Sequence, residues 1–200
     1  MNIDLNLSTL IPVHTNVEFI EPGVVRCTKT DKELPDENTY AKVNGLVFHN
    51  GVIEVDVNGG LLNDAPDYAR GFIGIVFRAS EDDSEFESFY IRPTNGGRCE
   101  DPVRKKHGCQ YFSYPGYTFS YFREFGIETY EAPVSTIELN KWSHIKAVIS
   151  EDKADFFVDE QPVLHVDGLK HGAHTRGSVG LYVDIGTDGR FRNLCIECAD

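Results

Sequence analysis

Two short segments, residues 71–79 and 86–93, alternate between apolar and polar side chains with a period of two. Successive side chains of a β-strand point to opposite faces of the sheet, so this period predicts two strands that share one apolar face. The predicted apolar face holds Ile73, Ile75, Phe77, Phe89 and Ile91. The opposite face holds Arg78, Tyr90 and Arg92. The pattern therefore predicts a hairpin with one apolar face and one face that is polar and aromatic.

Similar short runs recur along the chain. Strands are predicted over residues 19–27, 41–48, 52–57, 142–149, 153–158, 162–166, 177–183 and 190–196. Short strands that recur every ten to twelve residues and are separated by turn residues are typical of an antiparallel sandwich or jelly roll. We therefore expect an all-β fold of two antiparallel sheets in a single domain spanning residues 1–200. The core of the sandwich is expected over about residues 17–197.

Residues 94–109 lose this periodicity and are expected to form a long surface loop. The run Arg104-Lys-Lys-His107 makes this loop cationic, although the chain as a whole carries a formal charge of -13. The run indicates either a solvated loop or a contact for an anion or a partner. The acidic balance of the whole chain argues against nucleic acid and against an anionic membrane surface as partners.

Residues 110–122 contain seven aromatic rings and are divided by Pro115-Gly116. This stretch predicts strands or an ordered loop, and continued alternation would place Tyr117, Phe119 and Tyr121 on one face. Some of these rings are expected in the core. Others are available to stack against the C–H face of a sugar ring.

The order of these elements resembles the concanavalin A-like lectin/glucanase superfamily, and more narrowly its laminin-G-like and 3-keto-disaccharide hydrolase-like bacterial single-domain jelly rolls. The matching residues are Trp142, His144, Lys146, Val158, Asp159, residues 162–166, 169–172 and 177–183, Phe191, Asn193 and Leu194, with residues 74–78 and 89–93 upstream. The resemblance implies two curved, stacked antiparallel sheets whose concave face commonly holds carbohydrate. Because this superfold hosts both lectins and hydrolases, it does not by itself choose between them.

A carbohydrate-binding site is our leading prediction. Two guanidinium groups beside a tyrosine on one sheet face indicate either structural ion pairs or a site for a saccharide or another small, oxygen-rich ligand. The predicted ligand-binding residues are Arg78, Tyr90, Arg92, Gln110, Tyr111 and Tyr117. The arginines and Gln110 would hydrogen-bond hydroxyl groups, and the tyrosines would stack on the ring.

A glycoside-processing hydrolase is the main alternative. Glu54-Val-Asp56 places two carboxylates on one face of a strand, which resembles the acidic strand of laminarinase-like hydrolases, although Asn58 stands where their third acid would be. Glu87 is a further candidate acid or base. A non-catalytic protein-interaction module is the third possibility, and the pattern specifies no oligomeric state.

No metal or other cofactor is predicted. Possible zinc ligands are present in Cys99, His107, Cys109, Cys195 and Cys198. A lone C-x-x-C inside a predicted strand is, however, more typical of buried thiols than of a zinc site. Five cysteines do not form a disulfide framework, and the first residues lack the features of a secretory signal, so a reducing, cytoplasmic setting is expected.

Overall fold

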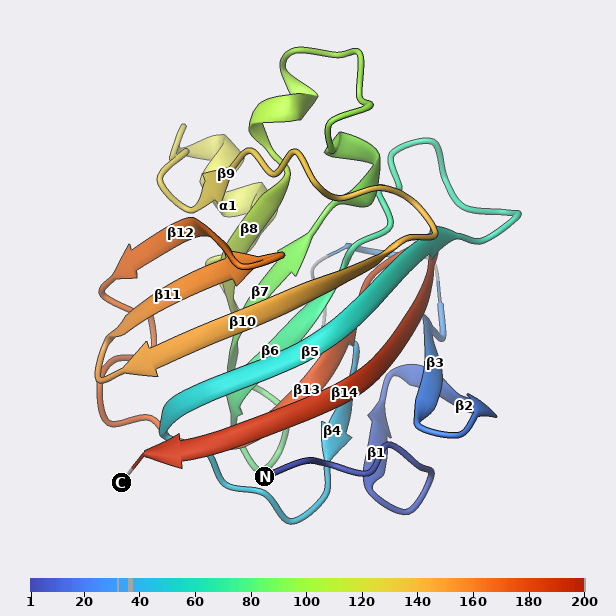
Figure 1. Ribbon diagram of the computed structural model, residues 1–200. Coiled ribbons are helices and arrows are strands. Elements are labelled where there is room, and N and C mark those ends of the chain that lie inside the picture. Colours follow the sequence, from blue (N-terminus) through green and yellow to red (C-terminus); the bar gives the residue numbers. More distant parts are fainter. Residues whose placement is uncertain (32, 36–37, 200) are drawn as a thin grey trace.

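The computed structural model describes residues 1–31, 33–35 and 38–199, and it is an antiparallel β-sandwich of two seven-stranded sheets (Figure 1). Sheet A has the order β12 (Gln161–Asp167), β11 (Lys153–Val158), β10 (Trp142–Ser150), β5 (Asn50–Leu61), β14 (Thr187–Ala199), β3 (Val24–Lys29) and β2 (Thr15–Glu21). Sheet B has the order β1 (Leu10–Val13), β4 (Tyr40–Val43), β13 (Ser178–Val183), β6 (Ile73–Ala79), β7 (Phe86–Ile91), β8 (Cys109–Tyr114) and β9 (Glu131–Ala132). This architecture confirms the predicted fold class.

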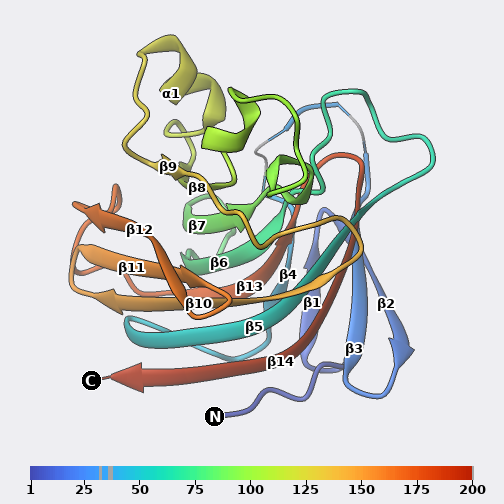
Figure 2. The ribbon, with the colours of Figure 1, turned by 45° about the horizontal axis from the view of Figure 1, so that its top comes forward.

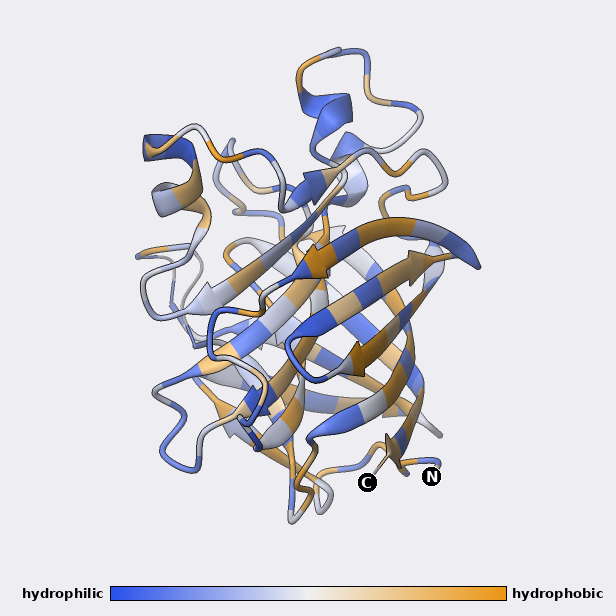
Figure 3. Cartoon of the chain, turned by 90° about the vertical axis from the view of Figure 1, so that its left-hand side faces the viewer, coloured by the Kyte–Doolittle hydropathy of each residue, from blue (hydrophilic) through white to orange (hydrophobic). Residues whose placement is uncertain are grey.

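The main core lies between the two sheets. Strand β5 directs Ile53, Val55 and Val57 inward and leaves the alternate side chains on the outer face of sheet A. In Figure 3 hydrophobic and hydrophilic residues alternate along several strands in the same way. The predicted apolar face of the β6–β7 hairpin is confirmed, since all five of its residues are buried in this core. Each such side chain contributes about 1.5–3 kcal/mol through burial.

A second apolar cluster covers the outer face of sheet B. Its buried residues are Val13, Tyr40, Phe72, Val76, Ala79, Phe86, Tyr90, Phe112, Phe122, Tyr182 and Ile185. We call it the outer cluster. Edge-to-face contacts such as Phe86–Phe112, with ring centroids 5.7 Å apart, hold it together. Because these side chains are buried, most of this sheet face is filled, and it is not an open groove.

In the part of the chain that the structure describes, helices are short and lie at one end of sheet B. They are the 3-10 turns η1 (Pro93–Asn95) and η2 (Arg104–Lys106) and the helix α1 (Phe119–Glu124). Figure 2 shows these elements grouped at the same end as the 62–72 loop between β5 and β6. None of the helices in the described part of the chain is long and apolar enough to cross a membrane.

Several predicted elements differ from the structure. The segment predicted as one strand over 19–27 belongs to a hairpin of β2 and β3, whose turn places Gly23 at a φ of 76°. Strand β5 extends from Asn50 to Leu61, whereas the predicted strand covers only residues 52–57. After β8 the predicted alternation is wrong, because α1 replaces a strand and buries Phe122.

Candidate functional site

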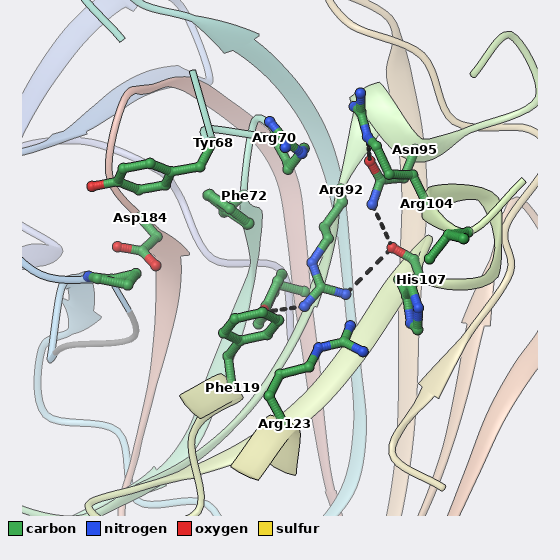
Figure 4. Close-up of a pocket in the computed structure, with 13 residues that line it drawn as sticks. Tyr68, Arg70, Phe72, Arg92, Asn95, Arg104, His107, Phe119, Arg123 and Asp184 are labelled. Atoms are coloured by element: carbon green, nitrogen blue, oxygen red, sulfur yellow. Dashed lines mark hydrogen bonds between the residues drawn. The ribbon is translucent and has the colours of Figure 1, made fainter. Parts of the chain in front are cut away.

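A pocket of about 370 Å³ lies at the end of sheet B where the helical elements gather. Its walls come from the 62–72 loop, β7, η1, η2, α1 and the turn after β13. The lining residues are Pro35, Tyr68, Arg70, Phe72, Tyr90, Arg92, Asn95, Val103, Arg104, His107, Phe119, Arg123 and Asp184 (Figure 4). Its volume lies near the lower end of the range of small-molecule sites, which suits a ligand of one or two rings.

Arg92 lies at the centre of the pocket (Figure 4) and is only 3% exposed. Its Nη2 donates to the hydroxyl of Tyr90 at 2.9 Å and to Oε1 of Gln110. The Tyr90 hydroxyl donates to the same Gln110 oxygen at 2.8 Å. On its other side, Nη1 lies 2.9 Å from Oε1 of Glu131. Nη1 also donates to the backbone oxygen of His107 at 3.3 Å, so both terminal nitrogens of Arg92 are engaged by protein acceptors and the guanidinium plane is fixed.

Glu131 joins Arg92 to two further basic groups. Its Oε2 lies 3.0 Å from Nη2 of Arg123 and 3.0 Å from Nδ1 of His107. The Glu131 side chain is 3% exposed, so these interactions are weakly screened by water. Burial lowers the pKa of His107, although Glu131 opposes this shift. The charges of Arg92 and Arg123 are thus shared by one buried carboxylate.

Aromatic rings form the apolar surfaces of the pocket. Phe72 packs edge-to-face on Tyr90 with ring centroids 5.8 Å apart. Phe119 receives the guanidinium groups of Arg92 and Arg123 over its ring, at 5.7 and 4.9 Å from the centroid. Tyr68 is 49% exposed at the edge of the pocket. Half-exposed rings beside fixed polar groups are suited to stacking on the C–H face of a sugar.

Asp184 supplies a carboxylate on the side of the pocket opposite to Arg104 and His107 (Figure 4). It follows directly after β13 and is 1% exposed, and its Oδ1 accepts a hydrogen bond from the amide of Ile185 at 2.6 Å. This bond holds the carboxylate in place. The pocket therefore combines acceptors on one side with donors on the other, as hydroxyl groups require.

The predicted ligand-binding residues fall into two groups. The structure confirms that Tyr90, Arg92 and Gln110 lie together, and Tyr90 and Arg92 line the pocket. The prediction that Arg78 shares their face is wrong. Arg78 has a φ of 54° at an irregularity in the β6–β13 pairing, and this left-handed backbone breaks the alternation of the strand.

Arg78 instead lies buried outside the pocket. It donates to the backbone oxygens of His49, Gly172 and Glu151 at 2.8, 3.2 and 2.7 Å, and to Oδ1 of Asn50 at 3.0 Å. These acceptors belong to β5 and to turns that precede or follow other strands. Arg78 is therefore a structural tie between segments of the sandwich.

Tyr111 and Tyr117 also lie outside the set of lining residues. Tyr111 faces the main core, where its hydroxyl donates to Oε2 of Glu87 at 2.5 Å, and burial raises its pKa. It faces the core because Gln110, its neighbour on β8, takes the outer face. Tyr117 is 36% exposed and contacts the ammonium group of Lys170, 5.3 Å from its ring centroid.

The three candidate catalytic carboxylates are dispersed. Glu87 is fully buried on the core side of β7, where it also accepts a hydrogen bond from the amide of His171 at 2.9 Å. Glu54 and Asp56 share the outer face of sheet A, as predicted. Asp56 accepts hydrogen bonds there from His144, Arg192 and Asn193. None of the three lines the pocket, and the role of Glu54, Asp56 or Glu87 as catalytic acid or base stays a prediction.

The cysteines do not form a metal centre. Within residues 1–31, 33–35 and 38–199, no three His, Cys, Asp or Glu side chains are placed to hold a metal ion, and the five cysteines are free thiols. Burial raises the pKa of Cys109 to about 12, which disfavours the thiolate that zinc binds.

Sequence reasoning missed several lining residues, among them Arg70, Phe72, Phe119 and Asp184. They stand in segments predicted to be a loop, a strand end or a strand face, and no local pattern connects them. Arg104 is different, because the cationic run 104–107 is interpreted as either a solvated loop or a contact for an anion or a partner. This run does supply two lining residues, Arg104 and His107.

Comparison with known proteins finds similarity in structure and not in sequence. No protein-family model matches the chain, and no curated protein matches it. Among solved structures, the carbohydrate-binding module CBM66 from Bacillus subtilis aligns with a TM-score of 0.64 and 14% identity, covering 94% of this chain and 95% of the other. A protein of unknown function with a galectin-like fold, also from Bacillus subtilis, aligns with a TM-score of 0.62 and 12% identity, covering 94% of this chain and 87% of the other.

The β-glucanase of Bacillus licheniformis aligns with a TM-score of 0.57 and 10% identity, covering 98% of this chain and 95% of the other. At these identities the similarity establishes architecture only. The alignments span nearly the whole of each chain, so they compare the complete sandwich. The chain therefore has the jelly-roll fold of the concanavalin A-like lectins and glucanases.

Proposed function

We propose that this protein binds a saccharide in the pocket at the end of sheet B. The observation that carries the proposal is a pocket with aromatic walls in which a guanidinium group, Arg104, lies on the side opposite to a carboxylate, Asp184 (Figure 4). Planar donors and a carboxylate acceptor bind hydroxyl groups with defined geometry, and Phe72, Phe119 and Tyr68 offer surfaces for the sugar ring. The carbohydrate-binding module with the same fold supports this proposal.

The pocket differs from the site predicted from the sequence in its position and its partners. It is smaller than a whole sheet face because the outer cluster fills the rest of that face. Tyr90 and Gln110 accept hydrogen bonds from Arg92, and of the predicted set Tyr90 and Arg92 line the pocket. A ligand of one or two rings, or the end of a longer chain, would fit this volume.

Glycan-array screening followed by isothermal titration calorimetry tests the proposal. Asp184→Asn should weaken binding by roughly 10- to 100-fold, because a charge-assisted hydrogen bond to a hydroxyl is lost. Tyr68→Ala should weaken it by about tenfold through loss of stacking. Phe125→Ala is the matched control, since Phe125 is a 60% exposed ring outside the pocket. Absence of saccharide binding would refute the function, and binding that survives both pocket substitutions would refute the site.

The same reagents separate a binding protein from a hydrolase. Chromogenic glycosides should be left intact by the wild-type protein. If they are hydrolysed and Asp184→Asn abolishes the hydrolysis, the pocket is an active site and the assignment changes to an enzyme. Loss of hydrolysis in Glu54→Gln or Glu87→Gln instead would place the chemistry away from the pocket.

A further inference from the structure

The pocket concentrates positive charge in a protein that is strongly acidic. Among the residues that the structure describes, four arginines line it, Arg70, Arg92, Arg104 and Arg123, together with one carboxylate, Asp184. The whole chain has 19 Lys and Arg residues and 32 Asp and Glu residues. Because acidic residues outnumber basic ones in this chain, its overall composition does not account for a pocket rich in arginine. The arginines therefore indicate that the ligand of the pocket carries negative charge.

Two of these arginines have no carboxylate partner among the described residues. Nη1 of Arg70 donates to the backbone oxygens of Asp67 and Ala69 at 2.7 and 2.8 Å. Arg104 donates from Nε to Oδ1 of Asn95 at 3.1 Å and from Nη2 to the hydroxyl of Thr94 at 2.9 Å. These acceptors are neutral, so they orient the guanidinium groups without balancing their charge.

Arg92 and Arg123 pair with the same carboxylate. They share Glu131, which also meets His107, so one carboxylate serves two guanidinium groups. Burial lowers the pKa of Arg70, and repulsion from Arg104 and Arg92 lowers it further. The charges of Arg70, Arg92 and Arg104 therefore act on one another at the pocket, and a bound anion would relieve their repulsion.

We propose that the pocket selects saccharides that carry an anionic substituent, with Arg70 and Arg104 as the residues that bind the anion. This inference rests on the proposed function and specifies its ligand class. Guanidinium groups match the planar carboxylate of a uronic acid and also the oxygens of a sulfate ester. Asp184 lies on the other side of the pocket, where it would accept a sugar hydroxyl and repel an anion placed in the reverse orientation (Figure 4).

Calorimetry with matched sugars provides the test. The probes are galacturonic acid with galactose, glucuronic acid with glucose, and glucose 6-sulfate with glucose, together with their short oligomers. The acidic member of a pair should bind roughly 10- to 100-fold more tightly than its neutral partner. The uronic acid and sulfate arms identify which anion is preferred.

Arg70→Gln and Arg104→Gln keep hydrogen-bonding capacity and remove charge. Each should reduce the preference for the acidic sugar by about tenfold, because the acidic sugar loses more affinity than its neutral partner. Arg98→Gln is the control, because it makes the same charge change at a side chain that is 84% exposed and outside the pocket. Thermal unfolding of each variant verifies that the fold is intact.

The outcomes distinguish the two proposals. Saccharide binding with no acidic preference would overturn this inference and leave the proposed function standing. Absence of binding to every saccharide, acidic or neutral, would overturn both. An acidic preference that Arg98→Gln reduces as much as Arg70→Gln would show an effect of net charge and would overturn the assignment of Arg70 and Arg104.

Discussion

At the scale of single residues, Glu131 is the side chain on which the pocket's cationic side depends. It is 3% exposed and lies within 3.0 Å of atoms of Arg92, Arg123 and His107. Removing the charge of a buried ion-pair partner leaves the opposite charge without compensation. The stability of the protein and the geometry of the pocket are therefore linked through this one carboxylate.

We expect Glu131→Gln to lower the free energy of unfolding by about 3 kcal/mol, because a buried carboxylate that pairs with Arg92 and Arg123 loses its charge. Urea denaturation followed by fluorescence measures this change. Glu138→Gln is the matched control: Glu138 pairs with Arg98 at 3.1 Å but is 30% exposed, so its loss should cost about 1 kcal/mol or less. Equal effects of the two substitutions would contradict the central position given to Glu131.

Asp56, on the outer face of sheet A, makes a contribution to the free energy of unfolding that depends on pH. Burial raises its pKa, but hydrogen bonds from His144, Asn193 and Arg192 outweigh this effect and lower the pKa below its ordinary value. A lowered pKa in the folded state means that the interaction stabilises the protein above the unfolded pKa of about 3.9. That contribution is lost as the pH falls through the folded value.

The stability difference between the wild type and Asp56→Asn should therefore be present at neutral pH and shrink as the pH falls below about 4. Its size should stay within about 1 kcal/mol, since the network is partly exposed. Denaturation at a series of pH values measures it. Glu197→Gln, an exposed substitution on β14, should show no such trend, and a difference that grows toward low pH would reverse the assigned sign.

At the scale of elements, strand β6 shows where period-two reasoning works and where it ends. Ile73, Ile75 and Phe77 face the core as predicted, because alternation follows from an extended backbone. The positive φ of Arg78 interrupts that extended backbone. The position holds an arginine and not a glycine or asparagine, the residues that usually adopt a positive φ, so the sequence does not indicate the interruption. The face of Arg78 could therefore not be predicted from the pattern.

Arg78→Met should lower the free energy of unfolding by about 3–5 kcal/mol, because four hydrogen bonds to β5 and the turns are lost. Saccharide affinity of the folded fraction should stay within about twofold of wild type, since Arg78 does not line the pocket. Arg78→Lys is the milder companion if the methionine variant does not fold. If Arg78→Met lost saccharide affinity while its free energy of unfolding stayed unchanged, Arg78 would belong to the binding site after all.

Helix α1 contains two phenylalanines in different environments. Phe122 is 2% exposed in the outer cluster, whereas Phe119 is partly exposed and lines the pocket. Their spacing of three residues fits a helix, but a short aromatic run after Pro115-Gly116 fits a strand equally well. For this reason the sequence predicted rings in this segment correctly and their faces incorrectly.

Phe122→Ala should destabilise the protein by about 3–4 kcal/mol, as large-to-small substitutions in a core do. Phe119→Ala should cost less than about 2 kcal/mol and should weaken saccharide binding by about tenfold through loss of stacking. Thermal denaturation and calorimetry on both variants measure the two effects. The assignment of α1 would be wrong if Phe122→Ala changed affinity alone and Phe119→Ala changed stability alone.

At the scale of the whole molecule, the sandwich was predictable because each strand carries its own apolar face. The pocket was not, because its walls come from segments between residues 35 and 184 that meet only after both sheets have formed. Tyr90, Arg92 and Gln110 were the exception, since neighbouring strands β7 and β8 bring them together. Local patterns predict local faces, and a site built from loops requires the tertiary fold.

The charge of the whole molecule and that of the pocket have opposite signs, and this opposition predicts the salt dependence of binding. At about 10 mM salt the Debye length is about 30 Å, so an approaching anionic sugar is repelled by the net charge of -13. At about 150 mM salt the length falls to about 8 Å, and the sugar interacts mainly with the pocket. The association rate of an acidic oligosaccharide should therefore rise with salt.

The dissociation rate should rise as well, because salt weakens the contacts with Arg70 and Arg104 once the sugar is bound. Stopped-flow fluorescence at increasing ionic strength measures both rates, and the matched neutral oligosaccharide should show little change in either. A fall in the association rate of the acidic sugar with salt would mean that the field of the four pocket arginines, and not the net charge, governs its approach.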